Sequence, residues 1–278
     1  MQSRLFDEMS TIDVGFDFTT DTKGYWDGFW EMRDGLGISR YDPDKESRTL
    51  RNYHRILWSR ELPNGEVMHL ENASSLGDYL AWQDYKFGSD SITASFRYKG
   101  NRALIEQVAA SMDDYRGFME DFIRRCYTIG GCIIFPKPHE GGDGRRTQSV
   151  NQARGRSSGP IRDRWDRTLE CIRLHYLGEP NPLSGVLKEE SWFFDKFVDF
   201  EGYVDFFLLQ DCVTPDYSEV IPWVGDLDFR TPPLPGDVDE YIQWIHNNLE
   251  FVDRRNARIK RFIGTGVCTE VESSDPPN

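Results

Sequence analysis

The sequence has no long apolar run and few cysteines. Nowhere in its 278 residues do about 18 consecutive apolar residues occur, so we expect no transmembrane helix. The first residues lack the basic start and apolar stretch of a secretory signal. The five cysteines are widely spaced and include no Cys-x-x-Cys pair, which argues against a disulfide framework or a zinc knuckle. We therefore predict a cytoplasmic protein with no membrane partner and with reduced, mostly buried thiols.

The motifs that identify common enzyme classes are also missing. There is no P-loop, no Gly-x-Gly-x-x-Gly after a strand, no His-Glu-x-x-His, no Gly-x-Ser-x-Gly and no kinase signature. The five histidines never pair at the spacing of metal ligands, so we predict no metal site. No cofactor can be named from this sequence.

Basic residues are outnumbered, with 33 Lys and Arg against 47 Asp and Glu and a net charge of −14. Such a charge repels anionic membranes and double-stranded DNA at long range. The exception is the segment 141–173, where eight arginines stand against four acids. That segment carries +4, which leaves −18 for the rest of the chain. A phosphate-bearing small molecule or RNA is therefore expected to bind there, if anywhere.

What the sequence does have is a globular composition rich in aromatic residues. Hydrophobic residues make 38% of the chain, charged residues 29% and aromatic residues 14%, which predicts a large aromatic core. Apolar residues recur at helical spacing in four long segments: 47–59, 101–126, 160–177 and 238–262. Ser47 or Thr49 would cap the first of these helices, and Pro160 would stand in the first turn of the third. Shorter elements are predicted strands at 66–70, 90–98 and 132–135 and a short helix at 76–82.

These elements predict a helix-rich α+β fold, a single domain with a small central sheet and an aromatic core. Residues 1–45 show no sustained periodicity, and we expect an arm that packs its aromatic side chains on the main domain of residues 46–265. Residues 266–278 are small, polar and acidic, which is typical of a disordered tail.

The best candidate site joins the Gly- and Ser-rich loop 145–156 to the predicted helix that follows. Arginine binds phosphate through two parallel hydrogen bonds, and a helix N-terminus at 158–160 would favour an anion. Projection of the helix at 100° per residue places Arg164, Thr168, Cys171 and His175 on the flank beside the apolar arc. The predicted ligand-binding residues are Asn151, Arg154, Arg156, Arg164 and Thr168.

The alternative for this segment is a solvated surface. Arg162–Asp166 and Asp163–Arg167 are spaced i,i+4, and Glu170–Arg173 is spaced i,i+3, so these residues could form a salt-bridged outer face. In that interpretation the arginines bind no ligand.

Three residues are candidates for proton transfer: His54, His175 and Asp205. Histidine is the side chain best suited to this role near neutral pH. However, His54 lies on the apolar stripe of its helix, so a hydrogen-bonded core histidine is the alternative, and His175 could be structural too. Asp205 and Asp211 fall in a strongly apolar segment, where pairing with an arginine of the 160–177 helix is the alternative to acid–base work.

Several segments together carry a resemblance. They are Tyr-Thr-Ile-Gly-Gly at 127–131, Asn-Gln-Ala-Arg-Gly at 151–155, Asp-Arg-Trp-Asp-Arg-Thr-Leu-Glu-Cys-Ile-Arg at 163–173, and Gly-Tyr-Val-Asp-Phe-Phe-Leu-Leu-Gln-Asp at 202–211. With Thr49–His54 and the turn at 62–65, they resemble an uncharacterised bacterial protein family over about residues 47–262. The resemblance implies no activity, cofactor or site residue, so it leaves function open.

Two hypotheses follow. The first is an enzyme acting on a phosphate-containing ligand (nucleotide, dinucleotide or RNA), with Arg154, Arg156 and Arg164 holding phosphate and His54 or His175 moving protons. The second is a non-enzymatic interaction protein, such as a defence or toxin–antitoxin component, whose acidic or aromatic surface binds a protein partner. The first requires arginines of 145–175 to meet a histidine and a carboxylate in a cleft.

Overall fold

The computed structural model describes residues 8–26, 29–30, 41–73, 79–96, 101–140, 145–156 and 159–268, without the side chains of 265–268. Within these ranges the chain is a helix-rich α+β fold with a small antiparallel sheet and an aromatic core, as predicted. Of the predicted tail, residues 266–268 belong to the last helix, and the remainder lies outside the described residues.

The sheet has the order β1-β2-β3-β4, and every neighbouring pair is antiparallel: β1 Glu71–Asn72, β2 Leu80–Trp82, β3 Tyr85–Ser91 and β4 Cys132–Pro136. The strand β4 is buried along its whole length, as its apolar run predicted. The predicted strand 66–70 is wrong, since only Val67 forms an isolated bridge. The predicted helix 76–82 is also wrong at residues 80–82, which pair with β3 across a tight turn at Gln83 (φ 54°).

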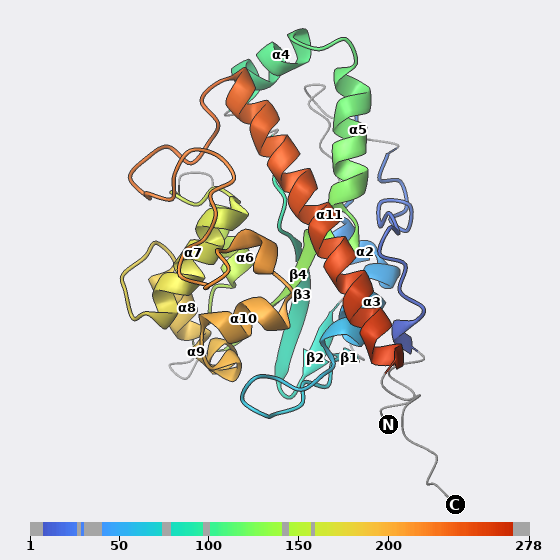
Figure 1. Cartoon of the computed structure of the whole chain (residues 1–278), viewed down its shortest axis with the longest axis vertical. Helices are drawn as coiled ribbons and strands as arrows, with labels where there is room; N and C mark the ends of the chain where they lie inside the picture. The colour runs from blue at the N-terminus through green and yellow to red at the C-terminus, as the bar shows by residue number, and fades with distance from the viewer. Residues whose placement is uncertain are drawn as a thin grey trace, which may run out of the picture.

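The helices and 3₁₀ turns follow in chain order: α2 Pro43–Glu46, α3 Arg48–Trp58, α4 Arg102–Ala110, α5 Tyr115–Cys126, η2 Ile129–Gly131, α6 Val150–Arg154, α7 Trp165–Tyr176, α8 Ser184–Glu189, α9 Ser191–Phe194, η3 Asp195–Phe197, α10 Phe200–Phe206, η4 Gln210–Cys212 and α11 Val238–Cys268. Figure 1 shows α11 running diagonally beside α5, while α6 to α10 gather on the other side of β3 and β4. The sheet thus lies between a long helical layer and a group of short helices.

Local capping explains where two of the helices begin. Ser47 Oγ accepts a hydrogen bond from the N–H of Leu50 at 3.0 Å, so Ser47 caps α3 as predicted. The predicted helix 101–126 is interrupted after Ala110. It restarts at α5 because Asp114 accepts from the N–H of Gly117 at 2.8 Å, which is a second N-cap that the continuous apolar stripe concealed.

The helix α7 begins at Trp165 rather than at 160. Arg162 and Asp163 have left-handed φ values of 48° and 63°, and the N–H of Asp163 donates to the carbonyl of Arg154 at 3.0 Å. Of the predicted helix N-terminus at 158–160, residues 159 and 160 are not helical, so that part of the prediction is wrong, and residue 158 lies outside the described residues.

A connected cluster of buried apolar residues runs from Met9 to Ile263. The N-terminal segment contributes aromatic rings to it: Phe18 packs edge-on against Tyr53 (ring centroids 5.7 Å apart) and Tyr25 against Tyr127 (5.8 Å). The packing is consistent with an N-terminal arm, and the division into arm, main domain and tail stays a prediction.

The core also encloses a cation on α11. Arg255 is fully buried and donates to the main-chain carbonyls of Gly130, Cys132 and Phe207 at 2.8–3.1 Å. Burial lowers the pKa of Arg255 to about 10, so the group stays charged near neutral pH. This one side chain ties α11 to η2, to the start of β4 and to the end of α10.

Candidate functional site

Arg154, a predicted phosphate ligand, is only 1% exposed at the end of α6. Its guanidinium donates to Asp90 Oδ2 (2.8 Å), to the carbonyl of Asp163 (2.8 Å) and, through Nε, to Thr168 Oγ1 (3.2 Å). Desolvation raises the pKa of Asp90 to about 6, although the charge of Arg154 acts in the opposite direction. Arg154 and the buried Thr168 therefore link α6, β3 and α7 within the protein.

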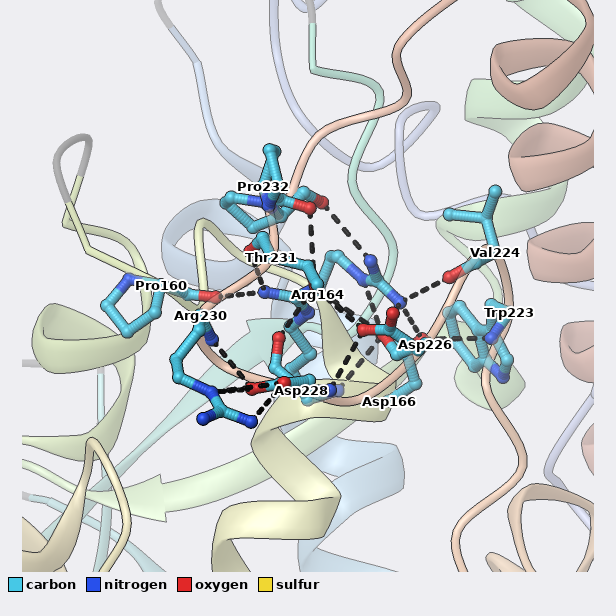
Figure 2. Close-up of polar contacts among 12 residues, drawn as sticks. Pro160, Arg164, Asp166, Trp223, Val224, Asp226, Asp228, Arg230, Thr231 and Pro232 are labelled. Atoms are coloured by element: carbon cyan, nitrogen blue, oxygen red, sulfur yellow. Dashed lines mark hydrogen bonds and ion pairs between the residues drawn. The ribbon is translucent and has the colours of Figure 1, made fainter.

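Arg164, a second predicted phosphate ligand, forms a buried ion pair with Asp166 at the start of α7 (Figure 2). The Nη2–Oδ2 distance is 2.6 Å and the Nε–Oδ1 distance is 3.1 Å. Asp166 also accepts from the N–H of Trp223 (2.9 Å), and Arg164 donates to the carbonyl of Val224 (2.7 Å). The pair thus holds the loop 223–233 against α7.

Arg167 adds further hydrogen bonds between α7 and the loop 223–233. Its Nη1 donates to the carbonyls of Pro160 (2.9 Å) and Thr231 (3.0 Å), and its Nη2 donates to Thr231 Oγ1 (2.8 Å). Burial is the main cause that lowers the pKa of Arg167. Asp166 and Arg167 are both fully buried, so their predicted place on an outer face is wrong. The predicted Glu170–Arg173 ion pair is present, at 2.8 Å.

His54 lies in the core and is 1% exposed. Trp58 Nε1 donates to His54 Nδ1 at 3.0 Å, which leaves the ring proton on Nε2, 3.0 Å from Ser89 Oγ. Ser89 Oγ in turn donates to Asp44 Oδ1 at 2.5 Å. Burial, together with the charge of Arg255, lowers the pKa of His54 to about 3. This geometry favours the alternative of a satisfied core histidine that connects α3, β3 and α2.

His175 lies near the C-terminal end of α7, half-buried beside the ring of Phe194. Arg164 precedes the first residue of the same helix. Eleven residues of helix separate them by roughly 16 Å, so the structure does not bring these two candidates to one site.

Asp205 and Asp211 do not pair with α7 as the structural alternative predicted. Asp205 is exposed and accepts hydrogen bonds from Gln210 Nε2 and Tyr217 Oη, both at 2.7 Å. Asp211 pairs with Arg258 of α11 at 3.0 Å. The apolar segment 203–209 buries its other side chains and leaves these two acids toward its edge.

Arg156 differs from Arg154 and Arg164 because it is exposed and lines a hollow of about 280 Å³. Its Nη2 donates to Gln148 Oε1, which fixes the side chain at the rim. Asn151, on α6, is half-buried, and its Oδ1 has no hydrogen-bond partner among the described residues. Of the predicted arginine ligands, Arg156 is placed to meet a ligand from solvent.

His139, which was not among the predicted site residues, lies beside Arg146. The chain closes back on itself after β4, since Glu140 and Arg146 form an antiparallel bridge and the N–H of Thr147 donates to the carbonyl of His139 at 2.8 Å. This places His139 beside Thr147, with His139 Nδ1 3.3 Å from Thr147 Oγ1 and 3.7 Å from Glu190 Oε1.

Glu190 is the buried partner of this histidine. Its side chain is 0% exposed, and it accepts from Trp192 Nε1 at 2.9 Å and from Thr147 Oγ1 at 3.4 Å. Burial is the main cause that raises the pKa of Glu190, and the nearby His139 acts against it. His139 is half-buried, and its Nε2 has no hydrogen-bond partner within the described ranges. Thr147 Oγ1 therefore links an accessible imidazole to a buried carboxylate.

Two adjoining hollows meet at Arg146. The first, of about 440 Å³, is lined by Pro138, His139, Glu140 and Arg146. The second is the hollow of Arg156, and Arg146 lines it as well. We call the two together the Arg146 cleft. It brings two arginines of the predicted basic loop to a histidine and a carboxylate, the combination that the enzyme hypothesis requires.

Sequence patterns alone gave little signal for this cleft. His139 follows a buried strand at its carboxyl end, where functional side chains often gather, but it stands alone in the sequence. Glu190 precedes an aromatic run and could not be linked to His139 without the fold. Within the described residues, no group of three or more His, Cys, Asp or Glu side chains is placed to hold a metal ion.

Comparison with known proteins gives a family without an assigned activity. A family model described as "Family of unknown function (DUF6994)" matches residues 12–259. Neither the curated proteins nor the solved structures contain a significant match. In the part of the chain that the structure describes, no helix is long and apolar enough to cross a membrane.

Proposed function

The chain belongs to DUF6994, a family of unknown function, and we propose from its geometry that it binds a small phosphate-bearing ligand in the Arg146 cleft and exchanges protons with it through His139. The observation that carries the proposal is the pairing of His139 with the fully buried Glu190. Thr147 Oγ1 donates to Glu190 and can therefore accept from His139 Nδ1–H, which favours the tautomer that leaves Nε2 as a base.

The charges around the cleft support an anionic ligand. Arg146 and Arg156 are exposed, while Arg154 and Arg164 are occupied by protein acceptors. In a protein of net charge −14, two exposed arginines at one cleft focus an anion there. The volumes of the hollows suit a small molecule, and the acidic surface beyond them would repel a long RNA.

The chemistry that fits is hydrolysis or transfer at a phosphate ester. Arg146 would hold the phosphoryl oxygens, as arginine commonly does. His139 Nε2 would accept a proton from an attacking water as the new P–O bond forms. The ester P–O bond then breaks, and the same imidazolium returns its proton to the leaving oxygen. Glu190 would stabilise the imidazolium while it is charged.

The proposal is tested by calorimetric binding of inorganic phosphate and by hydrolysis of p-nitrophenyl phosphate. We expect Arg146→Ala to weaken phosphate binding at least tenfold, since it removes a charge-assisted pair of hydrogen bonds. His139→Asn should lower hydrolysis by about 10²-fold or more. Glu190→Gln should lower hydrolysis while leaving phosphate affinity close to that of the wild type.

Two matched variants serve as controls. Arg230→Ala removes an arginine whose side chain is 90% exposed and that pairs only with Asp228 in the described structure, and His69→Ala removes an exposed histidine. Neither should change binding or hydrolysis. Phosphate binding that is equal in the wild type and Arg146→Ala, or that is absent from both, would overturn the proposal.

The cytoplasmic location and the alternative of a protein partner are also proposals. Four of the five cysteines are buried free thiols, which supports a reducing compartment. The net charge of −14 supports a basic partner for the alternative function. A pull-down with the wild type and Arg146→Ala separates the two functions, because the cleft variant should not affect an acidic interaction surface.

A further inference from the structure

We infer that Thr147 couples the protonation of Glu190 to the tautomer of His139, so that the imidazole is a base while Glu190 is ionised and an acid once Glu190 is protonated. This inference deepens the proposed function, on which its use in catalysis rests. Its basis is a chain of hydrogen bonds that runs from the cleft to the buried carboxylate. Thr147 is a positioning residue in this chain, because its hydroxyl acts through His139.

The Thr147 hydroxyl connects the imidazole to the carboxylate. His139 Nδ1 lies 3.7 Å from Glu190 Oε1, which is too far for a direct hydrogen bond, whereas Thr147 Oγ1 lies 3.3 Å from the nitrogen and 3.4 Å from the oxygen. Thr147 Oγ1 also accepts from the main-chain N–H of His139 at 3.1 Å, and the N–H of Thr147 donates to the carbonyl of His139 at 2.8 Å. These main-chain bonds hold the hydroxyl between its two partners.

The direction of the chain depends on Glu190, because a hydroxyl has one proton to donate. While Glu190 is ionised it can only accept, so Thr147 donates to Oε1 and accepts from His139 Nδ1–H, and Nε2 is free as a base. A protonated Glu190 instead donates to Thr147, whose own proton then turns to Nδ1. Nδ1 becomes an acceptor, so the ring proton stands on Nε2, which can donate it to a ligand.

Trp192 determines which oxygen of Glu190 takes part. Its Nε1 donates to Oε2 at 2.9 Å, so the proton of an un-ionised Glu190 stands on Oε1, beside Thr147. The Trp192 ring stacks on Tyr85 with centroids 3.5 Å apart, and the His139 ring meets both rings edge to face at 6.2 Å and 5.0 Å. This packing opposes rotation of the imidazole, so the same nitrogen stays beside Thr147.

The chain can carry one proton in two short steps. After Nε2 of His139 takes a proton from an attacking water, the Nδ1–H bond breaks and that proton joins Thr147 Oγ1. The original hydroxyl proton of Thr147 passes to Glu190 Oε1, which leaves an uncharged imidazole and an un-ionised carboxyl. The same steps in reverse ionise Glu190 while Nε2 gives its proton to the leaving oxygen.

The surroundings of Glu190 allow it to change its protonation. Burial is the main cause that raises the pKa of Glu190, and the charge of Glu189 acts in the same direction. His139 and the hydrogen bonds from Trp192 and Thr147 act against that shift. Titratable or charged groups lie around the chain on three sides: Tyr85 of β3, Glu140 and Arg146 of the segment after β4, and Glu189 of α8.

The test is heteronuclear NMR of the histidine ring nitrogens as a function of pH, without any ligand. Near neutral pH we expect the wild type to carry the ring proton of His139 on Nδ1. As the pH falls, the two nitrogens should exchange roles, with Nε2 gaining a proton while Nδ1 loses its own, before both are protonated in more acidic solution. An ordinary histidine protonates without this exchange, and the exposed His69 is the reference within the same protein.

Three variants test the members of the chain. Thr147→Val keeps the shape and removes the hydroxyl, so the exchange should disappear, and Thr147→Ser, which retains a hydroxyl, should restore it. Glu190→Gln should imitate the protonated carboxyl, because its oxygen can accept from Trp192 while its NH₂ donates to Thr147. In that variant His139 should carry its proton on Nε2 already near neutral pH. With p-nitrophenyl phosphate, Thr147→Val should lower kcat about tenfold and leave KM close to that of the wild type.

The outcomes separate the coupling from the proposed function. A wild type in which both nitrogens of His139 protonate without the exchange, an exchange that survives Thr147→Val, or a Glu190→Gln variant that keeps the proton on Nδ1 overturns the coupling and leaves the proposed function standing. An exchange in a protein that does not bind inorganic phosphate supports the coupling and overturns the proposed function.

Discussion

The buried pair Arg164–Asp166 is expected to be indispensable for folding and dispensable for ligand binding. Arg164→Ala leaves the Asp166 carboxylate, which is fully buried, without its cation. It also removes donors from the carbonyls of Val224 and Pro233. Breaking a buried pair by removing one partner costs about 3–5 kcal/mol. For a chain of this size, that loss lowers the melting temperature by roughly 6–20 °C.

The assay is urea unfolding followed by circular dichroism, with scanning calorimetry as a second measurement. Arg156→Ala is the matched comparison, because this arginine is exposed, and we expect its free energy of unfolding to stay within about 0.5 kcal/mol of the wild type. The double variant Arg164→Met/Asp166→Asn should recover part of the loss, because no uncompensated charge remains.

Phosphate binding should show the opposite order. At a temperature where Arg164→Ala is folded, it should bind inorganic phosphate as the wild type does, while Arg156→Ala should bind more weakly. A purely structural role of the Arg164–Asp166 pair is refuted if the free energy of unfolding of Arg164→Ala lies within about 1 kcal/mol of the wild-type value, well below the expected loss. It is also refuted if the variant loses phosphate binding while fully folded.

Three further predictions concern the backbone and the core. Gly131→Ala would bring a Cβ to 1.9 Å from the carbonyl oxygen of Cys126 and should destabilise the protein by about 3 kcal/mol or more in urea unfolding, whereas Gly264→Ala on exposed α11 should stabilise it by about 0.5–1 kcal/mol. Val198 is 62% exposed and has a φ of 70°, so Val198→Gly should raise the free energy of unfolding by about 0.5–1 kcal/mol; a loss of stability would show that the strain argument is wrong. His54 has a folded-state pKa of about 3 against an ordinary 6.5, so the unfolded chain takes up its proton first as the pH falls. Stability should therefore decrease between pH 6.5 and pH 3 by up to ~1.4 kcal/mol per unit from this group, and His54→Gln should flatten the pH dependence measured by urea titration.

Local signals in the sequence predicted the elements whose cause is local. The Ser47 cap and the apolar face of α3, the buried strand β4 and the long helix α11 depend on residues close together in the chain. The break in the helix before Asp114 was not predicted, because the apolar stripe continues through the second N-cap.

The candidate site depends on distant contacts that periodicity cannot reveal. Asp166 and Arg167 were predicted to face solvent, yet the loop 223–233 covers them. The basic loop was correctly identified as the positive part of the chain, but its arginines divide between the interior and the Arg146 cleft according to the fold. Charge composition could locate the segment and could not distinguish Arg154 from Arg156.

The cation of Arg255 has a consequence for biosynthesis. The carbonyls of Gly130, Cys132 and Phe207 receive their hydrogen bonds from a helix that the ribosome makes after all three. Until α11 emerges, those acceptors and the apolar surface around them have no native partner, so the nascent chain cannot complete its core. This order predicts that the core closes late in translation, in a nearly all-or-none step.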